Sequence, residues 1–212
     1  MGPNAIGLTW QADKSKIIET ALPYFEAGRE VVLIGHSYGG IPACAATEGH
    51  GVDERRKLGK KGGFKSIIFI SAFVIPVKGW DLLTTFGGAW PDWQNVGEAY
   101  TKNKFSIPNE KCIELLYSDA NEADAREAFT KAVPQSQDAF ETGCDFIASD
   151  LSIPGTYVIT AEDKSFPIAL QEQVVKSIPG IKEVRLASGH FPFLGKAAET
   201  AKLVVNIVEG KA

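Results

Sequence analysis

A serine between glycines stands at the centre of the segment GHSYGG, residues 35–40, which matches the G-x-S-x-G pattern of a nucleophile elbow. Four consecutive apolar residues at 31–34 precede it and predict a strand buried on both faces. The alanine-rich stretch 41–47 follows it and predicts a tightly packed helix. A serine on a sharp strand-to-helix turn can attack a carbonyl carbon. This context favours a nucleophilic role for Ser37 over that of a plain turn serine.

The residues around Ser37 have their own expected tasks. Ser37 must have strained backbone angles in such a turn, and we expect bulk at Gly35 or Gly39 to clash with neighbouring elements. The turn would place the backbone N–H of Tyr38 at a helix N-terminus, where it can donate to a developing oxyanion.

A serine nucleophile needs a base, and the chain has three histidines. His36 is the neighbour of Ser37 in the sequence, so its side chain is expected to point elsewhere and to be structural. His50 follows Gly49, which suits a helix C-cap, and is expected to lie beside the last carbonyls of that helix. His190 comes directly after the last expected strand and before the last expected helix, so we predict that it is the base.

The base in turn needs an acid that fixes its tautomer and stabilises the imidazolium. Asp163 follows the strand that ends in the letters GTYVIT, and it completes the chain order Ser37, Asp163, His190. Glu162 is the competing acid beside it, and Asp145 and Asp150 are weaker candidates further from the strand. We favour Asp163.

Three segments carry a family resemblance: GHSYGG after the strand VVLIG, TAEDKSFP after the next-to-last strand, and SGHFPFLGKAAE near the end. They resemble the plant methylesterase and hydroxynitrile lyase branch of the α/β-hydrolase superfamily, and more closely its fungal and bacterial relatives. The resemblance runs from Asn4 to Val208 and implies an esterase-type fold, a helical cap and the triad named above. Hydroxynitrile lyases of that branch carry a lysine directly after the catalytic histidine. Phe191 stands there in this chain, which argues against cyanohydrin cleavage.

The front of the chain departs from that resemblance. Family members begin with a strand, an oxyanion-hole loop of the H-G-x-x or P-G-x-W type and a second strand, whereas here a helical pattern starts close behind Met1. We therefore expect an N-terminally truncated core without the second oxyanion donor. Loss of one such donor costs about 10²–10³-fold in rate in related enzymes. Two alternatives stay open: the activity is reduced or altered, or another chain supplies the part.

The hydrophobic periodicity predicts the α/β class, with a parallel sheet flanked by helices and a helical cap inserted between its strands. The expected strands are 31–34, 66–73, 155–160 and 184–187, and the expected helices are 11–27, 41–47, 168–176 and 197–208. Residues 1–75 and 152–212 would form the hydrolase core, and residues 76–151, where no strand pattern is visible, the cap. The basic stretch 53–63 is expected to be a solvated loop.

The expected cap is rich in aromatic residues, which suggests an apolar or aromatic substrate cavity. Taken singly, each of its tryptophans is more typical of the packed core of a cap. We predict contacts with substrate for the following aromatic side chains: Trp80, Phe86, Trp90, Trp93 and Phe191.

Composition excludes several other classes of protein. The chain has 212 residues with a formal net charge of −4, which disfavours a nucleic-acid or anionic-membrane partner. No secretory leader and no apolar run long enough to span a bilayer are visible, so a cytoplasmic location is expected. The three cysteines are too scattered for a disulfide framework, and no metal-ligand spacing or dinucleotide motif occurs, so we expect no metal and no cofactor.

These observations predict a serine hydrolase for a small apolar or aromatic ester, thioester or lactone. The alternatives are a lyase, cyclase or dimerisation catalyst of small-molecule biosynthesis on the same scaffold, or a ligand-binding protein with impaired turnover. Without its usual neighbour the strand at 31–34 would form a sheet edge that has no charge or proline to guard it. We therefore also expect a homodimer, in which the partner covers that edge.

Overall fold

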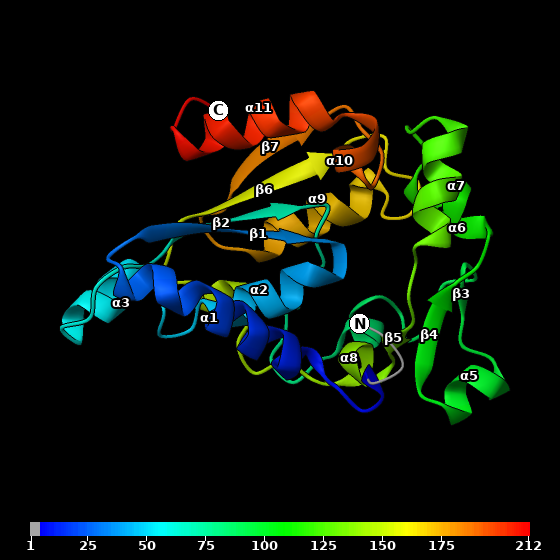
Figure 1. Ribbon diagram of the computed structural model, residues 1–212, viewed down its shortest axis with the longest axis horizontal. Helices are drawn as coiled ribbons and strands as arrows, with labels where there is room; N and C mark the ends of the chain where they lie inside the picture. Colours follow the sequence, from blue (N-terminus) through cyan, green and yellow to red (C-terminus); the bar gives the residue numbers. More distant parts are fainter. Residues whose placement is uncertain (1–4) are drawn as a thin grey trace.

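A four-stranded parallel sheet forms the centre of the computed structural model, which describes residues 5–212 (Figure 1). The strands lie in the order β1-β2-β6-β7, and each neighbouring pair is parallel. Their bounds are β1 (Glu30–His36), β2 (Gly63–Ile70), β6 (Gly155–Thr160) and β7 (Lys182–Leu186). The expected α/β class and the four expected strands are confirmed.

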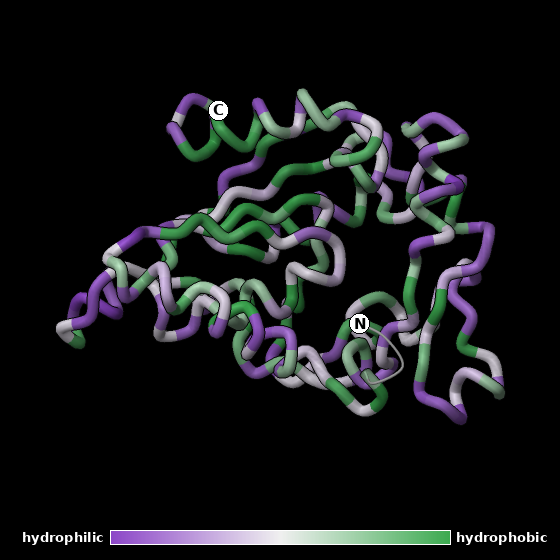
Figure 2. Tube along the Cα trace, viewed as in Figure 1, coloured by the Kyte–Doolittle hydropathy of each residue, from purple (hydrophilic) through white to green (hydrophobic). Residues whose placement is uncertain are grey.

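Helices cover both faces of this sheet, as the crossovers between parallel strands require. Helices α1 (Trp10–Glu26), α2 (Gly40–Ala46) and α9 (Ile168–Ser177) pack on one face, and α11 (Ala197–Val208) packs on the other (Figure 1). The apolar course of β2 and β6 between these layers is visible in Figure 2. Side chains such as Ile67, Phe69 and Tyr157 are fully buried there, so the centre of the sheet is the rigid base of the molecule.

Strand β1 differs from the two central strands because it is the terminal strand of the described sheet and pairs only with β2. The expectation of a sheet edge is therefore confirmed. The expectation that residues 31–34 are buried on both faces is wrong: Val31, Val32 and Leu33 are half-buried, and Ile34 is 43% exposed. On the face of the sheet that α11 covers, Val32 of β1 packs against the same cluster as Leu203 and Val204 of that helix. The homodimer stays a prediction.

The segment between β2 and β6 contains the expected helices and also short strands that the sequence pattern does not predict. A small antiparallel sheet has the order β3-β4-β5, with Asn95 opposite Ile107 and Phe105 opposite Ser136. Its strands are only two to four residues long, too short for an alternating pattern to show in the sequence. The elements are α4 (Leu82–Thr85), β3 (Gln94–Asn95), α5 (Glu98–Lys102), β4 (Phe105–Pro108), α6 (Lys111–Leu116), α7 (Glu122–Thr130), β5 (Gln135–Ser136), α8 (Asp138–Glu141) and η3 (Ala148–Asp150). The boundaries 76 and 151 stay a prediction.

The basic stretch 53–63 is a second correction, because it begins with a helix, α3 (Val52–Lys57), rather than a loop. The side chain of Glu54 accepts the N–H of Gly51 at 3.1 Å and so caps the first turn. Arg55 is buried, pairs with Glu26 at 2.8 Å and lies 4.9 Å from the ring centre of Phe25. One buried arginine thus anchors a helix in which Asp53, Arg56 and Lys57 are exposed.

No helix among residues 5–212 has the length and apolar character needed to cross a bilayer.

Candidate active site

Ser37 lies at the turn where β1 ends and the short 3-10 helix η2 (Ser37–Gly39) leads into α2. Its φ is +51°, a left-handed conformation that is strained for a residue other than glycine. The turn is held in place because the carbonyl of Ser37 accepts the N–H of Phe73, which follows β2, at 2.9 Å. The strained turn expected from the motif is present.

Close packing around this turn occurs at Gly35 and Gly40. A Cβ at Gly35 would lie 2.9 Å from the Cα of Gly40, and a Cβ at Gly40 would lie 2.5 Å from the backbone oxygen of Phe73. A Cβ at Gly39 would meet nothing within 4 Å. The expected clash at Gly39 is therefore wrong, because that residue faces open space and the α2 backbone packs through Gly40 instead.

The structure brings Ser37, His190 and Asp163 together from the ends of three strands. The Nε2 of His190 lies 2.9 Å from the Oγ of Ser37, and its Nδ1 lies 2.6 Å from the Oδ2 of Asp163. His190 and Asp163 are buried, at 2% and 7% exposure. A proton can therefore pass from Ser37 to His190 while Asp163 holds the other ring nitrogen.

The competing acids lie elsewhere. Glu162 is exposed beside Asp163, Asp145 is also exposed, and Asp150 forms an ion pair with Lys78 at 2.9 Å. Within the described residues, the carboxylate that accepts the hydrogen bond of His190 Nδ1 is that of Asp163.

The turn after β6 binds one oxygen of the Asp163 carboxylate. Oδ1 accepts hydrogen bonds from the backbone N–H of Ser165 at 2.9 Å, from the Ser165 hydroxyl at 2.9 Å and from the N–H of Phe166 at 2.8 Å. These donors are two and three residues away, so the segment after the strand orients its own acid.

The second oxygen of Asp163 collects donors from more distant parts of the chain. Besides His190, the hydroxyls of Ser71 and of Thr160 donate to Oδ2, the latter at 3.1 Å. Burial alone would raise the pKa of Asp163, but the hydrogen bond and charge of His190, with the Ser71 and Phe166 donors, lower it to about 2. The carboxylate is thus ionised at every pH at which a histidine base works.

Ser71 is a site residue that motif analysis missed. It follows β2, is fully buried, and has a positive φ of +42°. Its Oγ also lies 3.2 Å from the Nδ1 of His190. One signal in the sequence could have indicated Ser71: a hydroxyl side chain directly follows the apolar run SIIFI, which forms the strand next to β1.

The ring of His36 packs behind the loop of His190 and makes its hydrogen bond there rather than to Ser37, which agrees with the structural role expected for it. Its Nε2 lies 2.8 Å from the backbone oxygen of His190, and the two ring centres are 4.9 Å apart. Burial, together with the nearby charge of His190, lowers the pKa of His36 to about 4, so its ring is neutral at pH 7. His50 lies where predicted, with Nδ1 2.7 Å from the oxygen of Glu48.

The side chain of Tyr38 is directed away from the Ser37 hydroxyl. Its hydroxyl donates to Asp13 of α1 at 2.7 Å, and its ring centre lies 5.1 Å from that of Phe140. These contacts hold Tyr38 in the helical turn that contains Ser37. The backbone N–H of Tyr38 is the predicted hydrogen-bond donor to the oxyanion.

An apolar cavity of about 370 Å³ has a lining that does not include Ser37, Asp163 or His190 but includes residues hydrogen-bonded to Ser37 and Asp163. It adjoins them through Phe73, which bonds to Ser37, and through Ser165 and Phe166, which hold Asp163. Three of the predicted substrate contacts, Phe86, Trp90 and Trp93, belong to its lining. The lining is mostly apolar and consists of Phe73, Leu82, Leu83, Phe86, Ala89, Trp90, Pro91, Trp93, Gln94, Phe140, Ser165, Phe166 and Leu170.

Trp80 and Phe191, also predicted to contact substrate, are absent from this lining. Trp80 is 42% exposed and its backbone oxygen accepts the N–H of Cys144. Phe191 packs against Tyr117 and His36, with ring centres 5.0 and 4.8 Å away. The structure thus brings three of the five predicted aromatic residues together.

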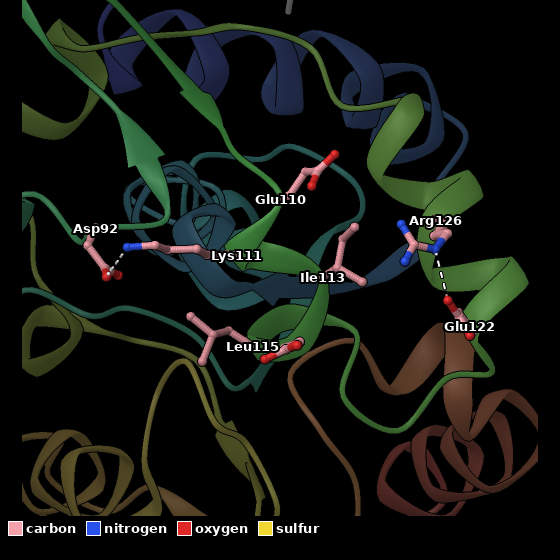
Figure 3. A pocket seen from close by; sticks show the side chains of 8 residues that line it. Asp92, Glu110, Lys111, Ile113, Leu115, Glu122 and Arg126 are labelled. Atoms are coloured by element: carbon pink, nitrogen blue, oxygen red, sulfur yellow. Dashed lines mark hydrogen bonds and ion pairs between the residues drawn. The ribbon is translucent and has the colours of Figure 1, made fainter.

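A larger hollow of about 710 Å³ is lined by residues of α6 and α7 together with Asp92 and Glu110, and its lining does not include Ser37, Asp163 or His190 (Figure 3). Its two cations are already paired, Lys111 with Asp92 at 2.8 Å and Arg126 with Glu122 at 3.0 Å. Elsewhere too, residues 5–212 contain no group of three His, Cys, Asp or Glu side chains suited to a metal ion.

A model of the alpha/beta hydrolase family matches residues 2–203 of the chain. The chain belongs to this family. The alpha/beta hydrolase nvfD of Aspergillus novofumigatus (strain IBT 16806) is 27% identical over 201 residues, which are 93% of this chain and 78% of that protein. The resemblance noted from the motifs is therefore confirmed at the level of the family, and a fungal relative is among the matches.

Solved structures of this hydrolase fold superpose on most of the chain. The pyrethroid hydrolase PytH has a TM-score of 0.71 at 18% identity, over 95% of this chain and 78% of its own. The methylesterase MES16 from Arabidopsis has a TM-score of 0.65 at 20% identity, over 92% of this chain and 76% of its own. At such identities the likeness establishes the fold, and the chemistry has to be argued from the site.

Proposed function

We propose that this alpha/beta hydrolase is a serine esterase for small apolar or aromatic esters, with Ser37, His190 and Asp163 as its catalytic residues. The observation that carries the proposal is the continuous chain of hydrogen bonds from Ser37 Oγ through both nitrogens of His190 to Asp163. Two of its structural neighbours, a pyrethroid hydrolase and a methylesterase, support the same reaction class.

The first half of the reaction forms an acyl-enzyme. The Oγ of Ser37 attacks the carbonyl carbon of the ester while Nε2 of His190 takes its proton. The negative charge on the carbonyl oxygen is stabilised by the N–H of Tyr38 at the start of the helical turn. Asp163 stabilises the imidazolium through the 2.6 Å contact, and the alcohol leaves with the proton that His190 returns.

The second half releases the acid. A water molecule gives a proton to Nε2 of His190 and attacks the acyl carbon, after which Ser37 regains the proton and the carboxylic acid departs. Thioesters and lactones follow the same steps with a thiol or a tethered alcohol as leaving group.

The proposed substrate class follows from the apolar cavity whose lining residues Phe73, Ser165 and Phe166 are hydrogen-bonded to Ser37 and Asp163. Its walls are dominated by Phe86, Trp90, Trp93 and Phe140, and within its lining the polar side chains are those of Gln94 and Ser165. Such a lining favours an apolar or aromatic group and offers no charged partner to an ionic one. A volume of about 370 Å³ suits a small molecule.

The test is hydrolysis of p-nitrophenyl acetate, butyrate and benzoate by the wild-type chain and by Ser37→Ala and His190→Ala. We expect turnover by the wild type and a fall to background in both variants, because the two groups act as one unit. A fluorophosphonate probe should label the wild type and leave Ser37→Ala unlabelled. Turnover that survives Ser37→Ala would show that another group is the nucleophile. Labelling without turnover of any ester would favour a non-hydrolytic reaction on the same site.

A further inference from the structure

Asp119 lies in the link between α6 and α7, yet its side chain reaches the loop that carries His190. Its Oδ2 accepts the backbone N–H of Gly189 at 2.8 Å, across 70 positions of the sequence. Gly189 directly precedes His190, so this bond fixes the peptide that leads into the proposed base.

Two glycines make room for this carboxylate. A Cβ at Gly189 would lie 2.6 Å from the Oγ of Ser118 and 2.9 Å from Oδ1 of Asp119. A Cβ at Gly195, the last residue of α10 (Pro192–Gly195), would lie 2.6 Å from the backbone oxygen of Asp119. Asp119 thus packs against both Gly189 and Gly195, which flank His190 in the sequence. Neither position has space for a side chain.

An apolar contact holds the other side of the same histidine. The ring of Phe191, directly after His190, packs 5.0 Å from that of Tyr117, and both belong to a cluster with Leu116 and Leu194. The residues before and after His190 are therefore both bound to residues 116–119, a part of the chain that no motif links with the triad.

The two carboxylate oxygens of Asp119 differ in their hydrogen bonding: Oδ2 accepts the N–H of Gly189, and Oδ1 is buried without a donor within the described residues. Desolvating a carboxylate oxygen without a donor costs free energy, which a neutral side chain in this place would avoid. A carboxylate in return gives the Gly189 N–H a charge-assisted bond, roughly twice as strong as a neutral one.

We propose that Asp119 is a positioning residue for His190, which couples the placement of the base to the segment between α6 and α7. The proposal rests on the proposed function in that His190 acts as the base there. Its physical reason is that the 2.9 Å approach of Nε2 to Ser37 depends on where the loop 189–191 is held. Misplacement of a catalytic group by 1 Å costs about 10²-fold in rate.

The experiment compares Asp119→Ala, Asp119→Asn and the control Glu114→Ala, an exposed carboxylate of α6. For p-nitrophenyl acetate we expect Asp119→Ala to lower kcat by about 10- to 100-fold. KM should stay within about twofold, because Asp119 does not line the apolar cavity. Asp119→Asn keeps an acceptor oxygen for Gly189 and should retain most of the activity. Asp119→Ser, too short to reach Gly189, replaces the alanine variant if that variant does not fold.

A proton NMR signal reports on His190 independently of turnover. The Nδ1–H proton shared with Asp163 should give a low-field resonance in the wild type, in Asp119→Asn and in Glu114→Ala. In Asp119→Ala we expect it to shift or to disappear through exchange with water. An unchanged resonance and unchanged kcat in Asp119→Ala would overturn the proposal, and so would a loss of kcat in Glu114→Ala as large as that in Asp119→Ala. If the wild type hydrolyses no ester, the resonance still decides the positioning role.

Discussion

The two sides of the His190 ring are built by different means. On the Nδ1 side, Asp163 is held by side-chain and backbone donors on both of its oxygens, and it is buried. On the Nε2 side, Ser37 is held by the shape of the backbone: a φ of +51°, one bond from the N–H of Phe73, and the contact of α2 through Gly40.

This difference determines how each side should respond to mutation. Several donors share the task of orienting Asp163, so the loss of one leaves the others in place. The geometry at Ser37 depends on close contacts between backbones, which cannot be relieved by a change of rotamer. We therefore expect graded losses on the acid side and abrupt losses on the nucleophile side.

The largest effect on the acid side should come from removing the charge of Asp163 itself. Asp163→Asn is expected to lower kcat by about 10²–10⁴-fold, because the amide no longer stabilises the imidazolium and favours the wrong tautomer. Glu162→Gln is the matched control, since that side chain is exposed. Ester hydrolysis measured with both variants decides. A damaging Glu162→Gln beside a mild Asp163→Asn would reassign the acid.

The next effect concerns His36, which joins the two sides because it precedes Ser37 and bonds to the backbone of His190. Its pKa in the folded chain is about 4, below the ordinary 6.5, so the unfolded chain binds the proton more readily. Stability from this group is therefore complete above pH 6.5 and is lost as the pH falls towards 4, by up to roughly 3 kcal/mol. The loss linked to Asp163 comes later, between pH 3.8 and about 2.

Urea unfolding between pH 7.5 and 4 measures this dependence. His36→Gln should flatten it, because glutamine can donate to the His190 carbonyl without titrating, whereas the control His50→Gln should keep it. An equal slope in wild type and His36→Gln would show that other groups cause the acid instability.

The same contrast explains how far sequence analysis reached. The main strands and helices are predictable because each shows an apolar run or a helical period in the sequence, and the triad because each member comes within four residues of the end of a strand. The missed features lack such local signals: β3, β4 and β5 are too short to show a period. The contacts of Ser71 with Asp163 and of Asp119 with Gly189 join residues 92 and 70 positions apart, which no local motif records.

On the nucleophile side, two adjacent glycines provide a direct comparison. Gly40→Ala would press a methyl group against the backbone oxygen of Phe73 at 2.5 Å, and we expect a loss of about 1–3 kcal/mol in unfolding free energy. Gly39→Ala has open space and a φ of −58°, so it should be neutral or stabilise by up to about 1 kcal/mol. Urea unfolding of both variants measures the difference. Equal effects would mean that the turn is not held by steric contact.

The smallest effect should come from Ser71→Ala on the acid side. The variant keeps the Cβ, and thus the strain at φ +42°, and removes only the hydroxyl that donates to Oδ2 of Asp163. Thr160 and His190 still donate to that oxygen, so kcat should fall by about 3- to 10-fold, the equivalent of one hydrogen bond of about 1 kcal/mol. Thr160→Val is the matched loss of the other hydroxyl, and the double variant should lose more than the two single variants together, because His190 is then the last side chain bonded to Oδ2. Kinetics of the four proteins test this. If either single variant is as inactive as Asp163→Asn, the donors do not share the orientation of Asp163. Loss of one contact would then lower kcat on the acid side as sharply as we expect at the turn of Ser37.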